Sequence, residues 1–206
     1  MPQPLSSFKN PGGIRLSNVG DYPLQRHEHL ATLAAEVIVS WSNVESFHLN
    51  LYMTLLGGPG QQAADIYLSL KSRSAKGEAI RAAAESIPQE YEDLLRKILS
   101  ISKSRQKDRD AIAHGIFGDC TGIPDALLIA SPRDMLLSGH DPDKIYVYRE
   151  GDFKRIIDGN EKLAGYGMKL QFILSNHPAN QDNWLYDQLC AVPEIRDIPS
   201  RQAHRP

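Results

Sequence analysis

An arginine and a histidine stand five residues apart in the segment RDAIAHG, which follows a strongly basic stretch of the chain. The guanidinium of Arg109 can hold a phosphate through two parallel hydrogen bonds and can oppose negative charge that develops in a transition state. His114 can transfer protons near neutral pH. This pair therefore suits cleavage of RNA by its own 2′-hydroxyl, a reaction for which no metal is obligatory and which excludes DNA as a substrate.

The stretch before this pair is the only local positive field in the sequence, with six basic side chains against one acid between positions 96 and 109. Arg105 and Arg109 continue the apolar stripe of the helix that we expect here, so they face inward and need partners. Lys103, Arg105 and Lys107 are candidates to bind RNA phosphates. The alternative for the lysines is a solvated basic face.

Helix geometry separates the two residues of the candidate pair. Five residues of ideal helix turn through about 500°, which leaves Arg109 and His114 some 140° apart. Distortion of the helix before Gly115, the reach of the arginine side chain or a second subunit must close that gap. The last explanation predicts a homodimer, because a two-fold axis brings the same patch of each chain together.

Other titratable residues are weaker candidates. Glu45 lies beside the buried stripe of the first expected helix, where it could orient the candidate pair through a charged hydrogen bond or be an ordinary boundary glutamate. His48 lies on that stripe and fits a core histidine better than a catalyst. His27 and His29 lack a third ligand at helical spacing, so no metal site is expected. The sequence also has no GxxxxGK loop and no GxSxG elbow.

The composition of the chain bounds its class. It has 206 residues, of which 41% are hydrophobic and 23% are charged, as in ordinary globular proteins. The net charge of −2 excludes a nucleic-acid binder that acts through bulk positive charge but allows a local basic patch. We expect neither a membrane span nor a signal peptide, and hence a cytoplasmic protein, without a cofactor. Cys120 and Cys190 predict neither a disulfide framework nor a zinc cluster.

The expected fold class is mainly α: an antiparallel four-helix bundle over residues 24–175 with a small β-hairpin inserted before its last helix. Apolar periodicity predicts helices at about 30–55, 66–87, 91–115 and 153–174. Short apolar runs predict the hairpin at about 120–150, and Asp152 is the expected N-cap of the last helix. Prolines and glycines predict a flexible N-terminal arm over 1–23, and further prolines predict a tail over 176–206.

The residues RDAIAH near the end of the third expected helix resemble the R-x4-H motif of the HEPN superfamily. This is a family of α-helical bundles, many of whose members are RNases, toxins or antiviral effectors. The resemblance covers about residues 24–175 and implies that Arg109 and His114 form the catalytic pair, with Asp110 at the position of the usual polar residue. It also implies a site built across a homodimer.

The leading hypothesis is a metal-independent endoribonuclease of HEPN type, with Arg109 and His114 catalytic and Asp110 and Glu45 in support. It would act as a homodimer in toxin or defence biology, and its partners would be RNA and an antitoxin or defence protein. The alternative is a catalytically silent HEPN-like module that binds RNA, a nucleotide or a protein through the same basic helix. A purely structural helical adaptor would leave the basic stretch as solvated surface and would not bind RNA.

Overall fold

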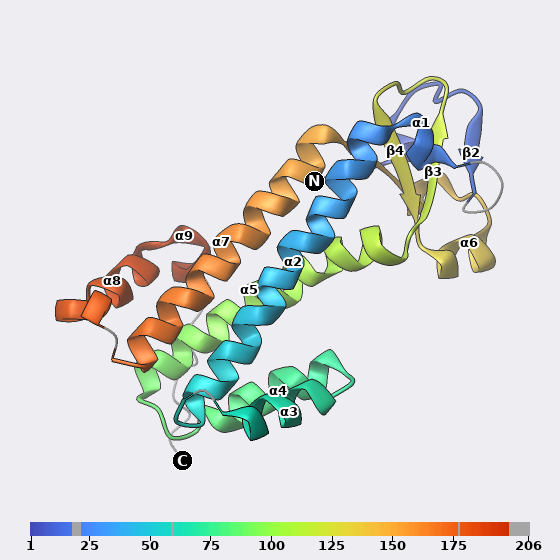
Figure 1. The fold of residues 1–206 in the computed structure, drawn as a ribbon. Helices are drawn as coiled ribbons and strands as arrows, with labels where there is room; N and C mark the ends of the chain where they lie inside the picture. The colour runs from blue at the N-terminus through green and yellow to red at the C-terminus, as the bar shows by residue number, and fades with distance from the viewer. Residues whose placement is uncertain (18–21, 59, 177, 198–206) are drawn as a thin grey trace, which may run out of the picture. The chain divides into compact units, whose positions relative to one another are not determined.

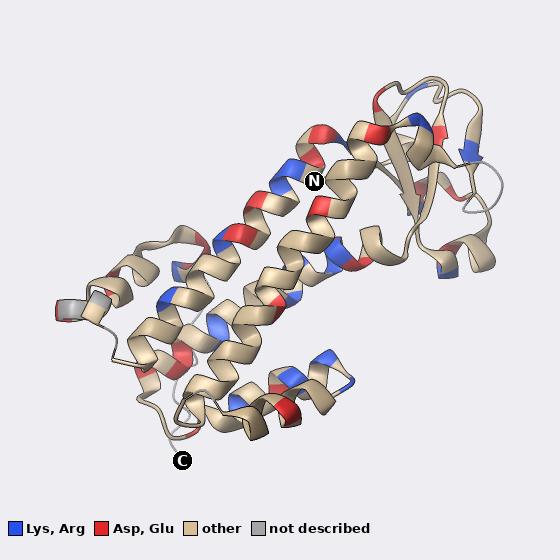
Figure 2. Ribbon diagram, viewed as in Figure 1, with Lys and Arg blue, Asp and Glu red and all other residues tan. Residues whose placement is uncertain are grey.

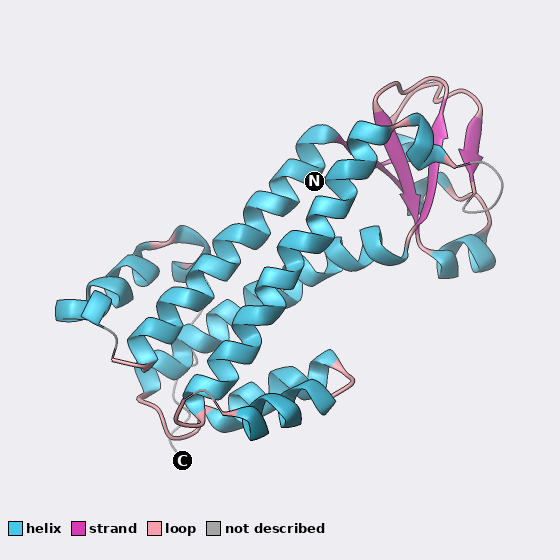
Figure 3. Cartoon of the chain, in the orientation of Figure 1, coloured by secondary structure: helices cyan, strands magenta, loops and turns pink. Residues whose placement is uncertain are grey.

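The computed structural model describes residues 1–17, 22–58, 60–176 and 178–197. Within these residues the chain is mainly helical, with a small antiparallel sheet (Figure 1, Figure 3). It divides into two compact units, residues 1–41 with 105–160 and residues 42–104 with 161–206. The division falls inside three long helices, so each of them contributes a part to either unit.

The helices are α1 (Pro23–Arg26), α2 (Glu28–Leu55), α3 (Gln61–Ser69), α4 (Arg73–Ala83), α5 (Gln89–His114), α6 (Pro132–Ser138), α7 (Glu150–Leu174), α8 (Trp184–Ala191) and α9 (Pro193–Arg196). The strands are β1 (Gln3–Pro4), β2 (Ile14–Leu16), β3 (Ile116–Cys120), β4 (Ala126–Ala130) and β5 (Ile145–Arg149), and short 3-10 helices are η1 (Leu5–Ser7), η2 (Pro142–Lys144) and η3 (Pro178–Asn183). No helix of the described residues has both the length and the apolar character that crossing a membrane requires.

The sheet of the first unit has the strand order β1-β5-β4-β3-β2, and each strand is antiparallel to its neighbours. The central strand β4, ALLIA, is buried along its whole length, as expected of an apolar strand that is covered on both faces. The hairpin predicted at 120–150 corresponds to β4 and β5, which pair from Ala126 and Arg149 to Ala130 and Ile145. These two strands belong to a larger sheet than the sequence predicted.

The N-terminal segment is part of this sheet, so the prediction of a flexible arm over residues 1–23 is wrong for its two strands. β1 pairs with β5 at one edge, and β2 pairs with β3 at the other. Leu5, which follows β1, is only 1% exposed. Prolines and glycines exclude a helix here, but they are compatible with short edge strands, which leave some backbone donors unpaired. Residues 18–21 lie outside the described part of the chain.

Apolar side chains cover both faces of the sheet. On one face, the first residues of α2 and α7 and the end of α5 form a core with β4 and β5: Leu30, Leu33, Ala34, Val37, Ile112, Leu127, Ile129, Tyr148, Phe153 and Ile156. The opposite face is closed by Leu5, Cys120, Ile123, Ala126, Leu128, Ala130, Ile145 and Val147. The second of these clusters depends on the N-terminal segment, which explains why that segment folds with the sheet.

Local capping sets the ends of the long helices. The N–H of Gly58 donates to the carbonyl of Met53 at 3.0 Å, and Gly57 has a φ of 99°, which glycine adopts without strain. This Schellman arrangement ends α2. At the start of α7, Asp152 is not the N-cap that we expected. It lies in the first turn of a helix that begins at Glu150, and it accepts the backbone N–H of Arg149 at 3.1 Å.

In the second unit, α3 and α4 replace the single helix predicted over 66–87. Ser72 separates them, because its side chain accepts the N–H of Ala75 at 3.1 Å and so caps α4. The apolar periodicity that begins at Ile66 also predicted the buried face of this segment one position too early. Tyr67 is 4% exposed there, whereas Ile66 is 47% exposed.

The predicted tail over 176–206 is largely helical in its described part, where η3, α8 and α9 follow one another. Leu185, Leu189 and Ile195 are buried in the second unit. Pro193 occupies the first position of α9, where the missing N–H of proline costs nothing. The prolines of this segment therefore begin helices as well as end them. Residues 198–206 lie outside the described residues.

Candidate functional site

Arg109, Asp110 and His114 all lie in the last part of α5, within the first unit. Ile112, on the same stretch of helix, is 3% exposed and anchors it in the core beside the sheet. His114 is the last residue of the helix and is exposed, and Gly115 begins the connection to β3. α5 continues without a break through both residues of the candidate pair, so distortion of the helix does not bring them to one face.

The guanidinium of Arg109 is largely buried and is held by its neighbour in the chain. Its side chain is 18% exposed, and its Nη1 donates to Oδ1 of Asp110 at 3.1 Å. Asp110 also accepts from Nε2 of Gln106 at 3.0 Å, which fixes the carboxylate from the preceding turn. The Nε of Arg109 is buried, with no hydrogen-bond partner among the described residues. Asp110 thus orients Arg109, and the Nε donor of Arg109 stays unused among the described residues.

The other residues of the basic stretch divide into inward and outward sets. The guanidinium of Arg105 packs against Gly159 of α7, where a Cβ would overlap it. Lys103 and Lys107 are exposed. The inward stripe expected for the arginines and the outward face expected for the lysines therefore both occur. Along α7, by contrast, basic and acidic residues are interleaved (Figure 2).

Asp108 is the one acid of the basic stretch. Burial raises its pKa, although the positive charges of Arg105, of the chain's N-terminus and of Arg155 act to lower it. The carboxyl of Asp108 therefore holds its proton more strongly than an ordinary aspartate. Sequence reasoning counted this residue only as a charge, because its partial burial depends on packing within the unit.

Each of the remaining candidates has a charged partner of its own. Glu45 belongs to the second unit and lies 3.7 Å from Arg73. In the first unit, His29 lies 3.3 Å from Glu150, whereas the other histidine proposed with it, His27, lies 3.7 Å from Asp119. Nowhere in the described ranges do three or more His, Cys, Asp or Glu side chains gather as a group able to hold a metal ion.

His48 of α2 is half-buried in the second unit, so its expected place on the buried stripe is met only in part. Burial is the main reason that its pKa is lowered to about 4, and the nearby charges of Lys76 and Arg73 add to the effect. Its Nε2 is buried without a hydrogen-bond partner in the described part of the chain. The expectation of a hydrogen-bonded core histidine is therefore met in part, because His48 is half-buried and its Nε2 has no partner among the described residues.

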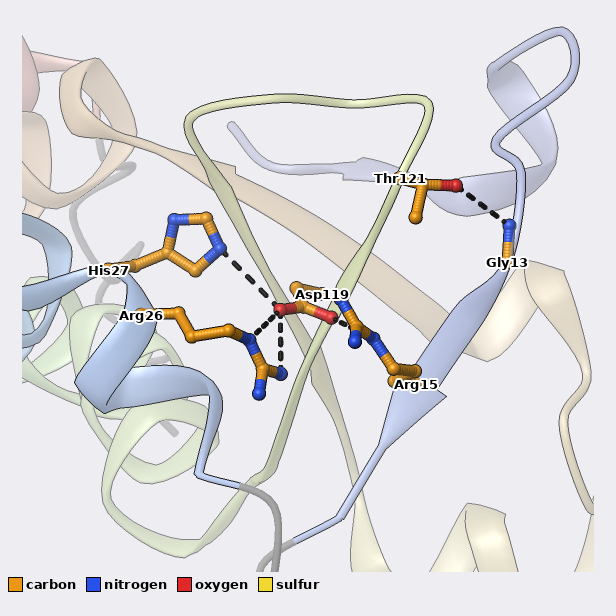
Figure 4. A network of polar contacts seen from close by, with 6 residues as sticks. All are labelled: Gly13, Arg15, Arg26, His27, Asp119 and Thr121. Carbon is orange, nitrogen blue, oxygen red and sulfur yellow. Dashed lines mark hydrogen bonds and ion pairs between the residues drawn. The ribbon is translucent and has the colours of Figure 1, made fainter.

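A connected polar cluster of the first unit lies near the end of β3, and sequence reasoning missed it (Figure 4). Oδ1 of Asp119 accepts from Nε of Arg15 at 3.1 Å. Its Oδ2 accepts from Nε and Nη2 of Arg26, each at 2.7 Å, and lies 3.7 Å from Nε2 of His27. We call these four residues the Asp119 cluster.

The electrostatics of the Asp119 cluster favour the ionised carboxylate. The Asp119 side chain is 6% exposed, and such burial alone would raise its pKa. The hydrogen bonds and positive charges of Arg26 and Arg15 outweigh that effect and hold the pKa below its usual value. Two arginines for one carboxylate leave a net positive charge on the cluster.

Chain topology brings the Asp119 cluster together. Arg15 and Asp119 stand directly opposite each other in the register of β2 and β3, as cross-strand ion pairs do. Arg26 is the last residue of α1, and His27 follows it. About 100 residues of chain separate Asp119 from these partners, so no local pattern in the sequence could have linked them. The only signal was an acidic residue in an otherwise apolar strand, IFGDC.

Comparisons with models of known protein families, with curated proteins and with solved structures found no match to this chain.

Proposed function

We propose that this chain is a cytoplasmic, metal-independent endoribonuclease of HEPN type, whose site combines Arg109 and His114 across a homodimer of four-helix bundles. One observation carries the proposal. A single helix, α5, holds a partly buried arginine anchored by a carboxylate and ends in an exposed histidine. A toxin or a defence effector is the biological role that such an activity fits, with an antitoxin or defence protein as partner.

The two residues have complementary tasks in this proposal. His114 takes the proton of the ribose 2′-hydroxyl while that oxygen attacks the neighbouring phosphorus. The bond from phosphorus to the 5′-oxygen then breaks, and the leaving oxygen receives a proton, which the protonated histidine of either subunit can supply. Arg109 holds the phosphate and opposes its additional negative charge. The products are a 2′,3′-cyclic phosphate and a 5′-hydroxyl.

The orientation of Arg109 supports this assignment. Asp110 occupies Nη1, so the arginine enters the site in one fixed orientation and loses little side-chain entropy on binding phosphate. Lys103 and Lys107 are exposed, and they supply phosphate contacts outside the reacting centre. Asp110 acts through Arg109 and is therefore a positioning residue. Glu45, which lies near Arg73 in the second unit, is not assigned a step.

A silent RNA-binding module is the second candidate, and the burial of Arg109 favours it. An arginine whose side chain is only 18% exposed and already engages Asp110 has little surface left to meet a substrate. In that case the exposed lysines carry RNA binding alone, and no product forms. Binding that weakens steeply with salt would be common to both candidates, because each lysine displaces counterions from the RNA.

The deciding experiment measures cleavage of single-stranded and structured RNA by the purified chain, with and without EDTA. We expect cleavage in EDTA and a product that ends in 2′,3′-cyclic phosphate. The His114→Ala variant should fold normally and lose about 100-fold or more in kcat, the usual effect of removing a general acid or base. His140→Ala, which removes another exposed histidine of the same unit, is the matched control.

Two results would contradict the enzyme. One is full activity in a folded His114→Ala protein. The other is cleavage that stops when metal is removed and returns with magnesium. RNA binding without any product, unchanged by His114→Ala, would instead establish the silent module.

A further inference from the structure

The Asp119 cluster is built as a positioned pair of arginines. Asp119 takes the Nε edge of Arg15, whose side chain is 51% exposed. The Nη1 and Nη2 donors of that arginine are therefore the ones left to meet another acceptor at the surface. Arg26 is 34% exposed and is fixed on the same carboxylate through two nitrogens. A guanidinium that is already oriented loses little entropy when it binds a further anion.

The charge balance of the cluster points in the same direction. Arg15 and Arg26 together carry two positive charges against the single negative charge of Asp119, whose pKa is lowered. His27, which is 21% exposed, adds a further charge when it is protonated. Counted among themselves, the residues of the cluster thus carry more positive than negative charge, whereas the chain as a whole has a net charge of −2.

We propose that the Asp119 cluster is a phosphate-binding site, in which Arg15 and Arg26 hold the phosphate of a nucleotide or an RNA strand and Asp119 positions them. The tetrahedral oxygens of a phosphate can accept from two guanidinium groups that come from different elements, here β2 and α1 (Figure 4). A carboxylate ligand would offer only two oxygens in one plane. Asp119 already binds the two arginines in this way within the cluster.

The site goes beyond the proposed cleavage and does not depend on it. Asp119 follows His114 by five residues, and five extended residues span at most about 18 Å. An RNA strand bound at the end of α5 is therefore within a few nucleotides of the cluster. A site of this kind would hold a phosphate away from the reacting bond and so fix the position of the strand.

The test has two parts. Titration calorimetry measures the binding of inorganic phosphate. Fluorescence anisotropy measures the binding of two short RNA oligonucleotides of the same sequence. One oligonucleotide carries a 5′-phosphate and the other a 5′-hydroxyl. We expect Arg15→Gln to weaken the binding of phosphate by about tenfold or more, since a hydrogen bond to a charged group is lost. Tighter binding of the 5′-phosphorylated strand would identify a terminal phosphate as the ligand, and equal binding would identify the RNA backbone.

Arg155→Gln is the matched control. Arg155 belongs to the same unit, is 55% exposed and also pairs with an aspartate, Asp152, at 3.1 Å. Its loss changes the net charge by the same amount but should change phosphate binding less than twofold. Equal effects of the two substitutions, or no binding of phosphate by the wild-type chain, would overturn the site and leave the cluster as a clamp between the N-terminal segment and the sheet.

Two further variants keep the test decisive. Arg15→Lys retains the charge and the strand but loses the guanidinium fork, so it should fold and bind phosphate with intermediate affinity. If it binds as the wild type does, a specific arginine site is excluded. His114→Ala should bind phosphate as the wild type does, whatever its effect on cleavage, so failure of the enzyme and failure of the phosphate site are separate results.

Discussion

Two aspartates of the first unit, one buried and one half-buried, show how partners decide the protonation of a carboxyl. Asp119 and Asp108 both lose solvation on folding, and in each case burial is the largest influence on the pKa. Asp119 accepts direct hydrogen bonds from Arg26 and Arg15, so its pKa falls. Asp108 has positive charges near it that compensate burial only in part, so its pKa rises. Contact geometry, rather than the number of nearby charges, separates the two residues.

His48 of the second unit, whose Nε2 is buried, gives a prediction for stability. The pKa of His48 is lowered to about 4 from the ordinary value of 6.5, so the unfolded chain binds more protons than the folded chain between these pH values. The free energy of unfolding should therefore fall as the pH falls through this window. We expect His48 to account for a loss of about 2 kcal/mol between pH 7 and pH 5.

Denaturant unfolding of the wild type and of His48→Leu at both pH values measures this contribution. The variant should lose about that much less stability than the wild type on acidification. His140→Leu, which removes an exposed histidine, is the control and should behave as the wild type does. The same pH dependence in wild type and His48→Leu would show that the histidine is hydrated in solution.

At the scale of elements, α7 carries two glycines of opposite consequence within one turn. A Cβ at Gly165 would meet no atom within 4 Å, whereas a Cβ at Gly167 would overlap the buried ring of Phe47. We expect Gly165→Ala to stabilise the protein by about 0.5–1 kcal/mol, because alanine favours the helix. Gly167→Ala should destabilise it by about 1–3 kcal/mol, since the ring must move. Thermal and denaturant unfolding of both variants would test this, and stabilisation by both would show that Phe47 moves freely.

The elements that sequence reasoning found are those whose signal is local. α2, α5 and α7 have apolar stripes that repeat within a few residues, and β4 and β5 are short apolar runs, so their positions could be predicted. β1 and β2 have only two and three residues, and they form only because partners more than 100 residues away supply the other strand. Their residues give no periodic signal.

The candidate sites follow the same rule. The half-burial of Arg105 and Arg109 follows from their spacing along one helix, which the sequence contains in full. The partner of Arg15 is Asp119, which lies 104 residues away in another strand. That pairing depends on the register of β2 and β3, and the register depends in turn on the core beneath the sheet. The local pattern of a single sequence does not reveal this pairing.

At the scale of the whole molecule, charge is distributed so that attraction to phosphate is local. The net charge is −2, yet the first unit contains the exposed Lys107 and the two arginines of the Asp119 cluster. A uniformly basic protein would bind any polyanion, whereas small positive sites on a weakly acidic surface favour a ligand that reaches them together. This arrangement is consistent with the proposed recognition of RNA strands.

The homodimer of the proposed function can be tested by mixing two inactive variants. If each site takes Arg109 from one chain and His114 from the other, a dimer of one Arg109→Gln chain and one His114→Ala chain has one intact site and one doubly defective site. Random mixing makes half of the dimers mixed, so about a quarter of the wild-type activity should return.

Analytical ultracentrifugation establishes that both variants dimerise, and differently tagged chains that co-purify establish that mixed dimers form. A mixture of His114→Ala with the double variant is the control and should stay inactive, because no chain in it carries the histidine. If mixed dimers form and remain inactive, the site does not combine the two chains, and the 140° that separates Arg109 from His114 on an ideal helix must be closed within a single chain.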